Sequence, residues 1–126
     1  MTTRNNGKKR ILCVDDDPDC CELIAVLLRG YEVVTAYSKH EAVRQATGES
    51  FDLYLLDYYL PDGTGLELCH FIRAFDKETP IIFCTSSDDI TQRHAVTAGA
   101  QQLLKKGYVL VENLEETVSR FLQLAA

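Results

Sequence analysis

The chain has 126 residues, of which 46% are hydrophobic and 25% charged, and its formal net charge is −6. This length is typical of one domain that buries its own core, and the composition excludes a disordered chain. The sequence has no apolar run near the ~20 residues that a membrane-spanning helix needs. Residues 1–10 are polar and basic, without the apolar segment of a secretory signal. The acidic balance argues against direct binding to nucleic acid.

Five cysteines occur, at positions 13, 20, 21, 69 and 84, and no two of them form a C-x-x-C pair. Cys13 and Cys84 lie inside apolar runs, where a thiol is typical of a small buried side chain. The odd count and the spacing favour neither a disulfide framework nor a metal site. We therefore expect reduced thiols and a cytoplasmic protein.

The first elements follow a polar segment, residues 1–9, which we expect to be a flexible tail. Residues 10–14 are apolar at successive positions, which is typical of a strand covered on both faces. Asp17 then caps a predicted helix, because Pro18 suits its first turn. Gly30 is the predicted end of this helix.

The alternation of strand and helix continues along the chain. The next two predicted helices each begin with a capping-box pattern, Ser38 with Glu41 and Thr64 with Glu67. The remaining predicted strands are residues 32–36, 51–56, 81–85 and 103–105.

Two further helices complete the pattern. Asp88 or Ser87 caps the predicted helix that ends near Gly99. The last predicted helix begins at Asn113, with Glu116 three residues later, and its apolar side chains repeat at helical spacing.

Five strand-then-helix units in succession predict a parallel sheet with right-handed crossovers and helices on both faces. The expected fold class is therefore α/β, a doubly wound, flavodoxin-like sheet with strand order 2-1-3-4-5. Residues 10–126 are predicted to form this single domain.

The ends of the predicted strands carry the polar residues. Asp15 and Asp16 follow the first strand, Asp57 follows the third, Thr85 ends the fourth and Lys106 follows the fifth. Sites in this fold form at the carboxyl ends of the strands, so we expect these side chains to meet in one crevice. Clustered carboxylates repel one another unless they take up protons or bind a cation.

Oxygen ligands alone suit Mg²⁺, which often bridges to a phosphate. A phosphoryl group could then lie between the metal ion and Lys106. A carboxylate oxygen of Asp57 could attack phosphorus and form an acyl phosphate, a known form of carboxylate nucleophilic catalysis.

Four segments, in this order and spacing, resemble the receiver domain of two-component response regulators. They are Ile11-Leu-Cys-Val-Asp-Asp-Asp-Pro18, Asp52-Leu-Tyr-Leu-Leu-Asp-Tyr-Tyr-Leu-Pro-Asp-Gly-Thr-Gly65, Pro80-Ile-Ile-Phe-Cys-Thr-Ser86, and Gly99-Ala100 followed by Lys106. The resemblance extends from about Arg10 to the end of the chain.

The resemblance implies that Asp57 is the phosphoacceptor, with Thr85 as the switch hydroxyl and Lys106 as the lysine that pairs with phosphoryl oxygen. It also implies a Mg²⁺ site formed by Asp16 directly, Asp15 more through water, Asp57 and the backbone carbonyl of Tyr59. The implied phosphoryl donor is a phosphohistidine on a sensor histidine kinase or a phosphotransfer protein. Phosphorylation would change the face formed by the fourth helix, fifth strand and fifth helix, which binds an unidentified downstream protein.

Three features of the sequence depart from the pattern of many receivers. Leu103 replaces an aromatic residue that couples to the threonine, although Tyr108 lies nearby. Gly107 replaces a proline, often in a cis bond, so the loop gains backbone freedom. Tyr58 and Tyr59 follow Asp57, and a bulky Tyr59 side chain at the mouth of the site would obstruct attacking water.

Two other functions stay open at this point. One is a receiver-like interaction module that phosphorylation does not regulate, which Leu103 and Gly107 favour. The other is an aspartate-nucleophile phosphatase, which Tyr59 opposes because such enzymes place an acid there. The sequence identifies neither the cognate kinase, the output partner nor the oligomeric state, and the chain is either a stand-alone receiver, without enzymatic activity on other substrates, or a fragment of a longer regulator.

Overall fold

The computed structural model describes residues 7–125, apart from the side chains of residues 109, 124 and 125. Five parallel strands form one sheet in the order β2-β1-β3-β6-β7. Counted by the strands of this sheet alone, that is the predicted order 2-1-3-4-5, so the fold prediction is confirmed. The strands are β1 Arg10–Val14, β2 Glu32–Ala36, β3 Leu53–Leu56, β6 Ile81–Thr85 and β7 Gln102–Lys105, and a separate hairpin consists of β4 Tyr59–Leu60 and β5 Gly63–Thr64.

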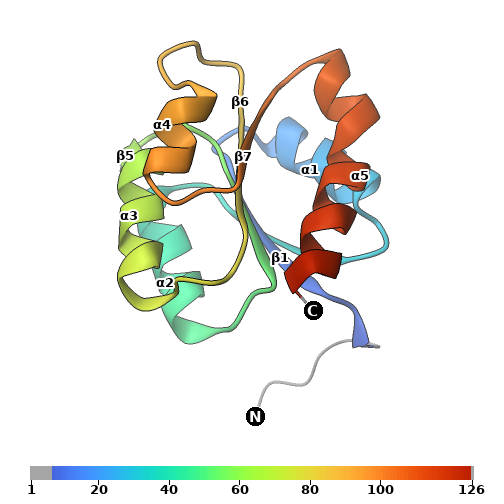
Figure 1. Ribbon diagram of the computed structural model, residues 1–126, viewed down its shortest axis with the longest axis horizontal. Coiled ribbons are helices and arrows are strands. Elements are labelled where there is room, and N and C mark those ends of the chain that lie inside the picture. The colour runs from blue at the N-terminus through green and yellow to red at the C-terminus, as the bar shows by residue number, and fades with distance from the viewer. Residues whose placement is uncertain (1–6, 126) are drawn as a thin grey trace.

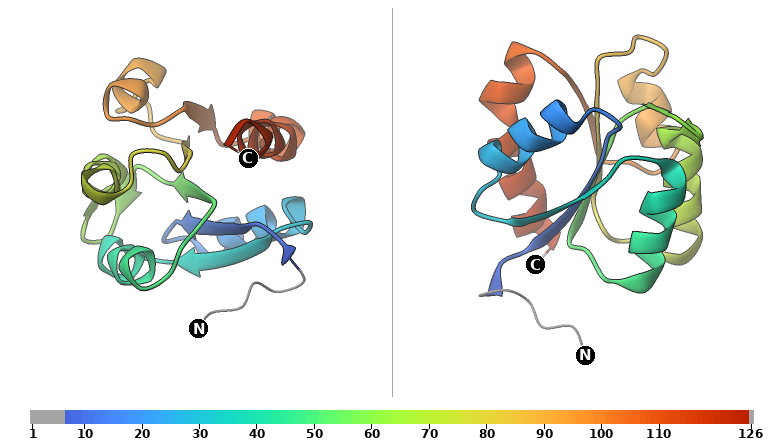
Figure 2. Two further views of the ribbon diagram at one scale, coloured as in Figure 1. Left: turned by 60° about the horizontal axis from the view of Figure 1, so that its bottom comes forward. Right: turned by 180° about the vertical axis from the view of Figure 1, so that it is seen from behind.

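Helices cover both faces of the sheet (Figures 1 and 2). They are α1 Pro18–Leu27, α2 Lys39–Gly48, α3 Gly65–Phe75, α4 Gln92–Thr97 and α5 Tyr108–Ala125. The left view of Figure 2 shows α1 and α5 on one side of the sheet and α2, α3 and α4 on the other. The carboxyl ends of the strands point upward in Figure 1.

Alternate strand residues supply two hydrophobic cores. Leu12 and Val14 of β1 face the core beneath α2, α3 and α4, whereas Ile11 and Cys13 face the core beneath α1 and α5. β1, β3 and β6 are buried at every position because they lie inside the sheet with helices on both sides. This burial explains why their sequences are continuously apolar rather than alternating.

The beginning of α1 agrees with the sequence prediction. Asp17 is its N-cap and accepts a hydrogen bond from the amide of Asp19 at 3.0 Å, with Pro18 in the first turn. The helix ends at Leu27 rather than at Gly30.

The two predicted capping boxes differ in completeness. Thr64 and Glu67 exchange both bonds at the start of α3. Ser38 accepts from the amide of Glu41 at 3.1 Å, but the Glu41 carboxylate accepts from the amide of Tyr37 instead of that of Ser38. The second helix is therefore capped by half of the predicted box.

The predicted cap of the fourth helix is wrong. Asp88 forms an ion pair, and Ser87 Oγ accepts from the amide of Asp89. The N-cap is Thr91, whose Oγ1 accepts from the amide of His94 at 3.2 Å. The helix begins later than predicted because the earlier side chains have other partners.

The predicted start of the last helix is also wrong. The helix begins at Tyr108 rather than at Asn113. Gly107 adopts a φ of +118°, and its carbonyl accepts from the amide of Leu110 at 3.1 Å. Leu110 and Leu114 belong to the same buried face of this helix. The apolar pattern of the helix therefore starts one turn before the capping signal at Asn113.

All five cysteines are free thiols, and Cys13 and Cys84 are buried, as expected. Every helix within residues 7–125 is too short or too polar to traverse a bilayer. Most of the expected tail, residues 1–6, and the last residue of the predicted domain, Ala126, lie outside the described residues.

Candidate functional site

The register of the sheet brings the predicted site residues to one edge. Val14 pairs with Leu56, and the amide of Asp57 continues this ladder by donating to the carbonyl of Val14 at 2.9 Å. In the same way, the amide of Lys106 donates to the carbonyl of Thr85 at 3.0 Å. The residues that follow β1, β3 and β7 therefore share the carboxyl edge of the sheet.

Lys106 joins two of the carboxylates at this edge. Its Nζ lies 2.6 Å from Asp15 Oδ2 and 3.0 Å from Asp57 Oδ2. Burial by itself would lower the pKa of Lys106, but hydrogen bonds and attraction to both carboxylates outweigh burial and raise it above its ordinary value. The ammonium is thus held in its charged form.

Asp16 adds a third carboxylate. One oxygen from each of Asp15, Asp16 and Asp57 lies within 4.8 Å of the other two. Asp15 is buried, Asp57 is half-buried and Asp16 is exposed, so the cluster opens to solvent on one side. A hard divalent cation such as Mg²⁺ fits this donor set, because it prefers oxygen ligands and keeps several waters.

The other carboxylate oxygens are fixed by the backbone. Asp15 Oδ1 accepts from the amide of Asp17 at 2.9 Å, and Asp57 Oδ1 accepts from the amide of Tyr58 at 2.7 Å. These bonds orient both side chains, so that the oxygens engaged by Lys106 are held in place.

Gly65 allows the chain after β3 to fold closely over Asp57. A Cβ at this position would lie 2.1 Å from the backbone oxygen of Asp57 and 2.8 Å from the Phe83 ring. The Gly65 amide also donates to the carbonyl of Tyr58 at 2.6 Å. Only glycine permits this approach, which fixes the segment that carries Tyr59.

A cavity of about 440 Å³ lies beside the carboxylates, and Asp16, Asp57, Tyr59 and Thr85 are among the residues that line it. The Tyr59 side chain is half-exposed at the edge of this cavity, as the sequence predicted. Its hydroxyl donates a hydrogen bond to Asp89, which lies in the segment between β6 and α4.

Thr85 is buried, and its hydroxyl oxygen accepts from the amide of Ser87 at 3.1 Å. The neighbouring Lys105 points elsewhere than Lys106: its Nζ pairs with Asp88 and with the carbonyl of Ser87, both at 2.5 Å. The geometry therefore separates the roles of the two lysines, which are adjacent in sequence.

The departures from the usual pattern have structural counterparts. Leu103 is half-buried against the core beneath α4. Tyr108 is 88% exposed at the start of α5, so its ring does not fill the space of the missing aromatic residue. No cis peptide bond occurs in the described part of the chain, so the bond before Gly107 is trans.

Sequence reasoning missed two polar contacts around the site. The hydrogen bond from Tyr59 to Asp89 and the ion pair of Lys105 with Asp88 both reach the segment between β6 and α4. Consecutive aspartates after a strand were a signal, but it was interpreted as a helix cap.

The chain matches the family described as "Response regulator receiver domain" over residues 11–119. It is 34% identical over 114 residues to the transcriptional regulatory protein TrcR of Mycobacterium tuberculosis, and 36% identical over 119 residues to the transcriptional regulatory protein ZraR of Salmonella typhimurium. These alignments cover 88% and 92% of this chain but 43% and 27% of those relatives. The chain therefore spans less than half the length of either.

Two solved structures are similar over nearly the whole fold. The BeF3-activated DrrB receiver domain has a TM-score of 0.83 at 30% identity, covering 92% of this chain and 98% of that one. The response regulator TrrA from Thermotoga maritima, in complex with Mg²⁺-BeF, has a TM-score of 0.81 at 34% identity, covering 90% and 98%.

Proposed function

The chain belongs to the response regulator receiver domain family, and we propose that it is a signalling switch that accepts a phosphoryl group on Asp57 in a Mg²⁺-dependent reaction. Phosphorylation-dependent switching is general in this family. The observation that carries the proposal is the cluster of three carboxylates, with Lys106 bonded to both Asp15 and Asp57.

Asp57 is the nucleophile in this proposal. A carboxylate oxygen attacks phosphorus, a P–O bond forms as the P–N bond to the donor imidazole breaks, and the bonding pair remains on the imidazole nitrogen. Asp15, Asp16, Asp57 and the carbonyl of Tyr59 would hold Mg²⁺. When bound, the ion neutralises charge on the carboxylates and on the phosphoryl oxygens.

Lys106 and Thr85 complete the proposed site. The ammonium of Lys106 already contacts Asp57, so it can bond a phosphoryl oxygen on that residue with a small side-chain movement. The hydroxyl of Thr85 is a donor that can turn toward the same group. If it turns, its bond from the amide of Ser87 changes.

This change has a route to the face formed by α4, β7 and α5, which we propose as the output surface. Ser87 is tied to β7 because its carbonyl accepts from Lys105. A movement of Thr85 therefore reaches both the start of the α4 segment and the edge strand. A switch of this kind needs a shift of only a few kcal/mol between two states.

The proposed donor is a phosphohistidine on a sensor histidine kinase or a phosphotransfer protein, and the proposed recipient of the signal is a further protein. Receivers are not enzymes in the usual sense, and we propose that this one acts only on its own phosphoryl group. We also propose that residues 10–126 form the receiver and residues 1–9 a tail.

Phosphorylation by acetyl phosphate tests the proposal directly. Intact mass measured with Mg²⁺ is expected to rise by one phosphoryl group, and to stay constant when Mg²⁺ is chelated by EDTA. Asp57→Asn is the matched variant, because it keeps the shape of the side chain and removes the nucleophilic charge. It should fold normally and gain no mass.

A different result would favour the interaction module. If the parent protein gains no mass with Mg²⁺ while its backbone NMR spectrum shows a folded chain, phosphorylation does not regulate it. Mass gain that persists in Asp57→Asn would instead place the phosphoryl group on another residue, and would contradict the assignment of Asp57.

A further inference from the structure

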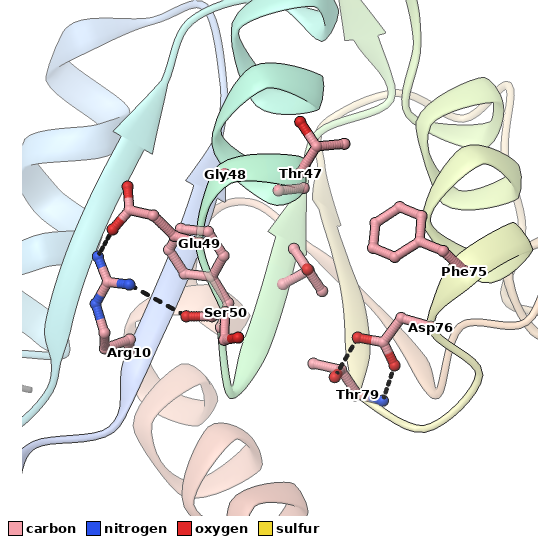
Figure 3. Close-up of a pocket in the computed structure, with 11 residues that line it drawn as sticks. Arg10, Thr47, Gly48, Glu49, Ser50, Phe75, Asp76 and Thr79 are labelled. Atoms are coloured by element: carbon pink, nitrogen blue, oxygen red, sulfur yellow. Dashed lines mark hydrogen bonds and ion pairs between the residues drawn. The ribbon is translucent and has the colours of Figure 1, made fainter. Parts of the chain in front are cut away.

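A second cavity, of about 730 Å³, lies at the amino edge of the sheet, at the opposite end from Asp57 (Figure 3). The ends of α2 and α3 flank it, with Thr47 and Glu49 on one side and Phe75 and Asp76 on the other. Helix carboxyl ends carry partial negative charge, so this position favours a positively charged group over an anion.

Tyr54, on β3, supplies an unpartnered polar group to this cavity. The residue is only 2% exposed and lines the cavity. Within the part of the chain that the structure describes, every polar side-chain atom that is fully shielded from solvent has a hydrogen-bond partner. The Tyr54 hydroxyl has no partner, so it is not fully shielded and is accessible from the cavity that Tyr54 lines. A buried phenol without a partner is costly unless a ligand or water bonds it.

Asp76 adds an acceptor with spare capacity. Its Oδ1 accepts from the amides of Glu78 and Thr79 at 3.1 and 3.0 Å, and its Oδ2 accepts only from Thr79 Oγ1. One lone pair of Oδ2 remains. Burial and the charge of Asp76 raise the pKa of Tyr54 to about 12, which is consistent with a negative field at the hydroxyl.

The cations around the cavity are already engaged. Arg10 is bonded by Glu32 at 2.9 Å and Glu49 at 2.6 Å. Arg73 donates to the backbone carbonyls of Asp76 and Gly99. Lys77 Nζ donates to the carbonyl of Arg73. Each of these cations already bonds an acceptor of the protein, which disfavours an anionic ligand here.

Aromatic side chains line part of the cavity. Phe51 and Tyr54 have ring centroids 5.8 Å apart, and the half-exposed Phe75 lines the opposite side. We propose that this cavity binds a small aromatic cation, of the arylamidine or arylalkylamine class. Its ring lies against these side chains, and its N–H groups donate to Tyr54 and Asp76. Such contacts combine cation–π attraction with charge-assisted hydrogen bonds.

Benzamidine is the probe for this site. Titration into the ¹⁵N-labelled protein is expected to shift backbone amide signals of residues 46–54 and 75–79, saturating in the range of about 1–10 mM that suits so small a ligand. Benzyl alcohol should bind more weakly, and benzoate should produce no saturable shift.

Two conservative variants test the assigned contacts. Tyr54→Phe removes only the hydroxyl, whereas Asp76→Asn removes the charge and replaces one acceptor oxygen with an NH2 donor. Each should weaken benzamidine binding by roughly fivefold or more. Tyr31→Phe, on the core beneath α1 and α5, is the matched control and should leave binding unchanged. The proposal would be overturned if benzoate bound as well as benzamidine, if Tyr54→Phe bound benzamidine with unchanged affinity, or if benzamidine shifted no signal of the parent. The Tyr54 hydroxyl would then be bonded by water alone.

Discussion

Each of the two edges of the sheet carries a cluster in which a basic side chain bonds two carboxylates, but the two clusters differ in how exposed their carboxylates are. At the amino edge, Arg10 lies between Glu32 and Glu49. At the carboxyl edge, Lys106 lies between Asp15 and Asp57. In both clusters one cation, buried in the case of Arg10 and half-buried in the case of Lys106, joins two carboxylates from different segments of the chain.

The two clusters differ in whether a carboxylate is left without a basic partner. The Arg10 guanidinium also donates to the carbonyl of Ser50 at 3.1 Å and lies over the Phe51 ring, so each of its three nitrogens donates a hydrogen bond. The carboxyl edge has a third carboxylate, Asp16, which is exposed. The carboxylates of the Arg10 cluster are both bonded by the arginine, whereas the carboxyl edge keeps an exposed carboxylate, which suits that edge to bind a cation.

Replacing Lys106 should have the largest effect on function. Lys106→Met keeps the length of the side chain but removes the ammonium, and phosphorylation by acetyl phosphate should slow by roughly 100-fold, as when one charge-stabilising donor is lost. Mg²⁺ should bind more tightly, because no ammonium competes for Asp15 and Asp57. Rates by intact mass and a Mg²⁺ titration by NMR measure both quantities.

Lys105→Met is the matched control. Lys105 is paired with Asp88 outside the carboxylate cluster, so its loss should leave the rate and the Mg²⁺ affinity nearly unchanged. If both variants slowed phosphorylation equally, the distinction between the two lysines would be wrong.

Replacing Arg10 should have the largest effect on stability. Arg10→Met leaves Glu32 and Glu49 without their cation, and removing one partner of a fully buried pair costs ~3–5 kcal/mol. The two glutamate side chains are 29% and 31% exposed, so we expect a smaller loss, of about 2–3 kcal/mol. Urea unfolding measures it, and phosphorylation of the folded variant should persist.

Arg120→Met provides the comparison for a surface arginine. Arg120 is exposed and bonds only Gln102 and the Phe121 ring among the described residues. Its replacement should change stability by less than about 0.5 kcal/mol. A loss as large as that of Arg10→Met would mean that the amino-edge cluster is not specially stabilising.

The sequence predicted the carboxyl edge much better than the amino edge. Parallel strands end at a common edge, so Asp15, Asp57 and Lys106 could be placed together from strand positions alone. The signal in the sequence is that each of these charged residues lies at the end of an apolar run. The short β7 was also found, although its first residue, Gln102, was missed.

Arg10 shows why the amino edge was not predicted. Its partners, Glu32 and Glu49, lie in separate segments, and nothing in the spacing links them. Tyr54 likewise reads as an ordinary strand residue, because a cavity depends on where two helices end. The starts of α4 and α5 were missed for a related reason: tertiary partners of Asp88 and packing of Leu110 outweighed the local capping signals.

Glycine substitutions compare the backbone at the two edges. Gly65→Ala places a Cβ against the backbone oxygen of Asp57, and overpacking of this kind costs roughly 1–3 kcal/mol. Gly48, the last residue of α2, has no atom within 4 Å of an added Cβ. Gly48→Ala should therefore be neutral or stabilise by up to ~1 kcal/mol.

Thermal unfolding of both variants shows whether the loss of stability comes from the close contact at Gly65 or from replacing any glycine with alanine. If Gly65→Ala were as stable as the parent, the chain after β3 could shift without cost. The close contact would then have no role in holding Tyr59 near Asp57.

Tyr59 should control how long the phosphoryl group persists. Its half-exposed ring lies at the cavity beside Asp57 and is held by Asp89. Tyr59→Ala should speed loss of the phosphoryl group by up to tenfold, which corresponds to ~1.4 kcal/mol, because water gains access. Tyr59→Phe keeps the ring and loses the hydroxyl, so it should lie between the two. Equal or slower loss from Tyr59→Ala would contradict shielding by the ring.

The smallest expected effect is a pH dependence at the amino edge. Burial would raise the pKa of Asp76, but bonds from the Thr79 hydroxyl and from the amides of Thr79 and Glu78 lower it below its ordinary value of 3.8. A depressed pKa adds stability that is present above that value and is lost as the pH falls through the folded pKa.

Asp76→Asn should therefore be less stable than the parent at pH 7 and should approach it as the pH falls through the lowered pKa of the parent carboxyl. Urea unfolding at a series of pH values measures this convergence. If the difference in unfolding free energy between Asp76→Asn and the parent stayed constant with pH, the stabilisation by Asp76 would come from the shape of its side chain rather than from its charge.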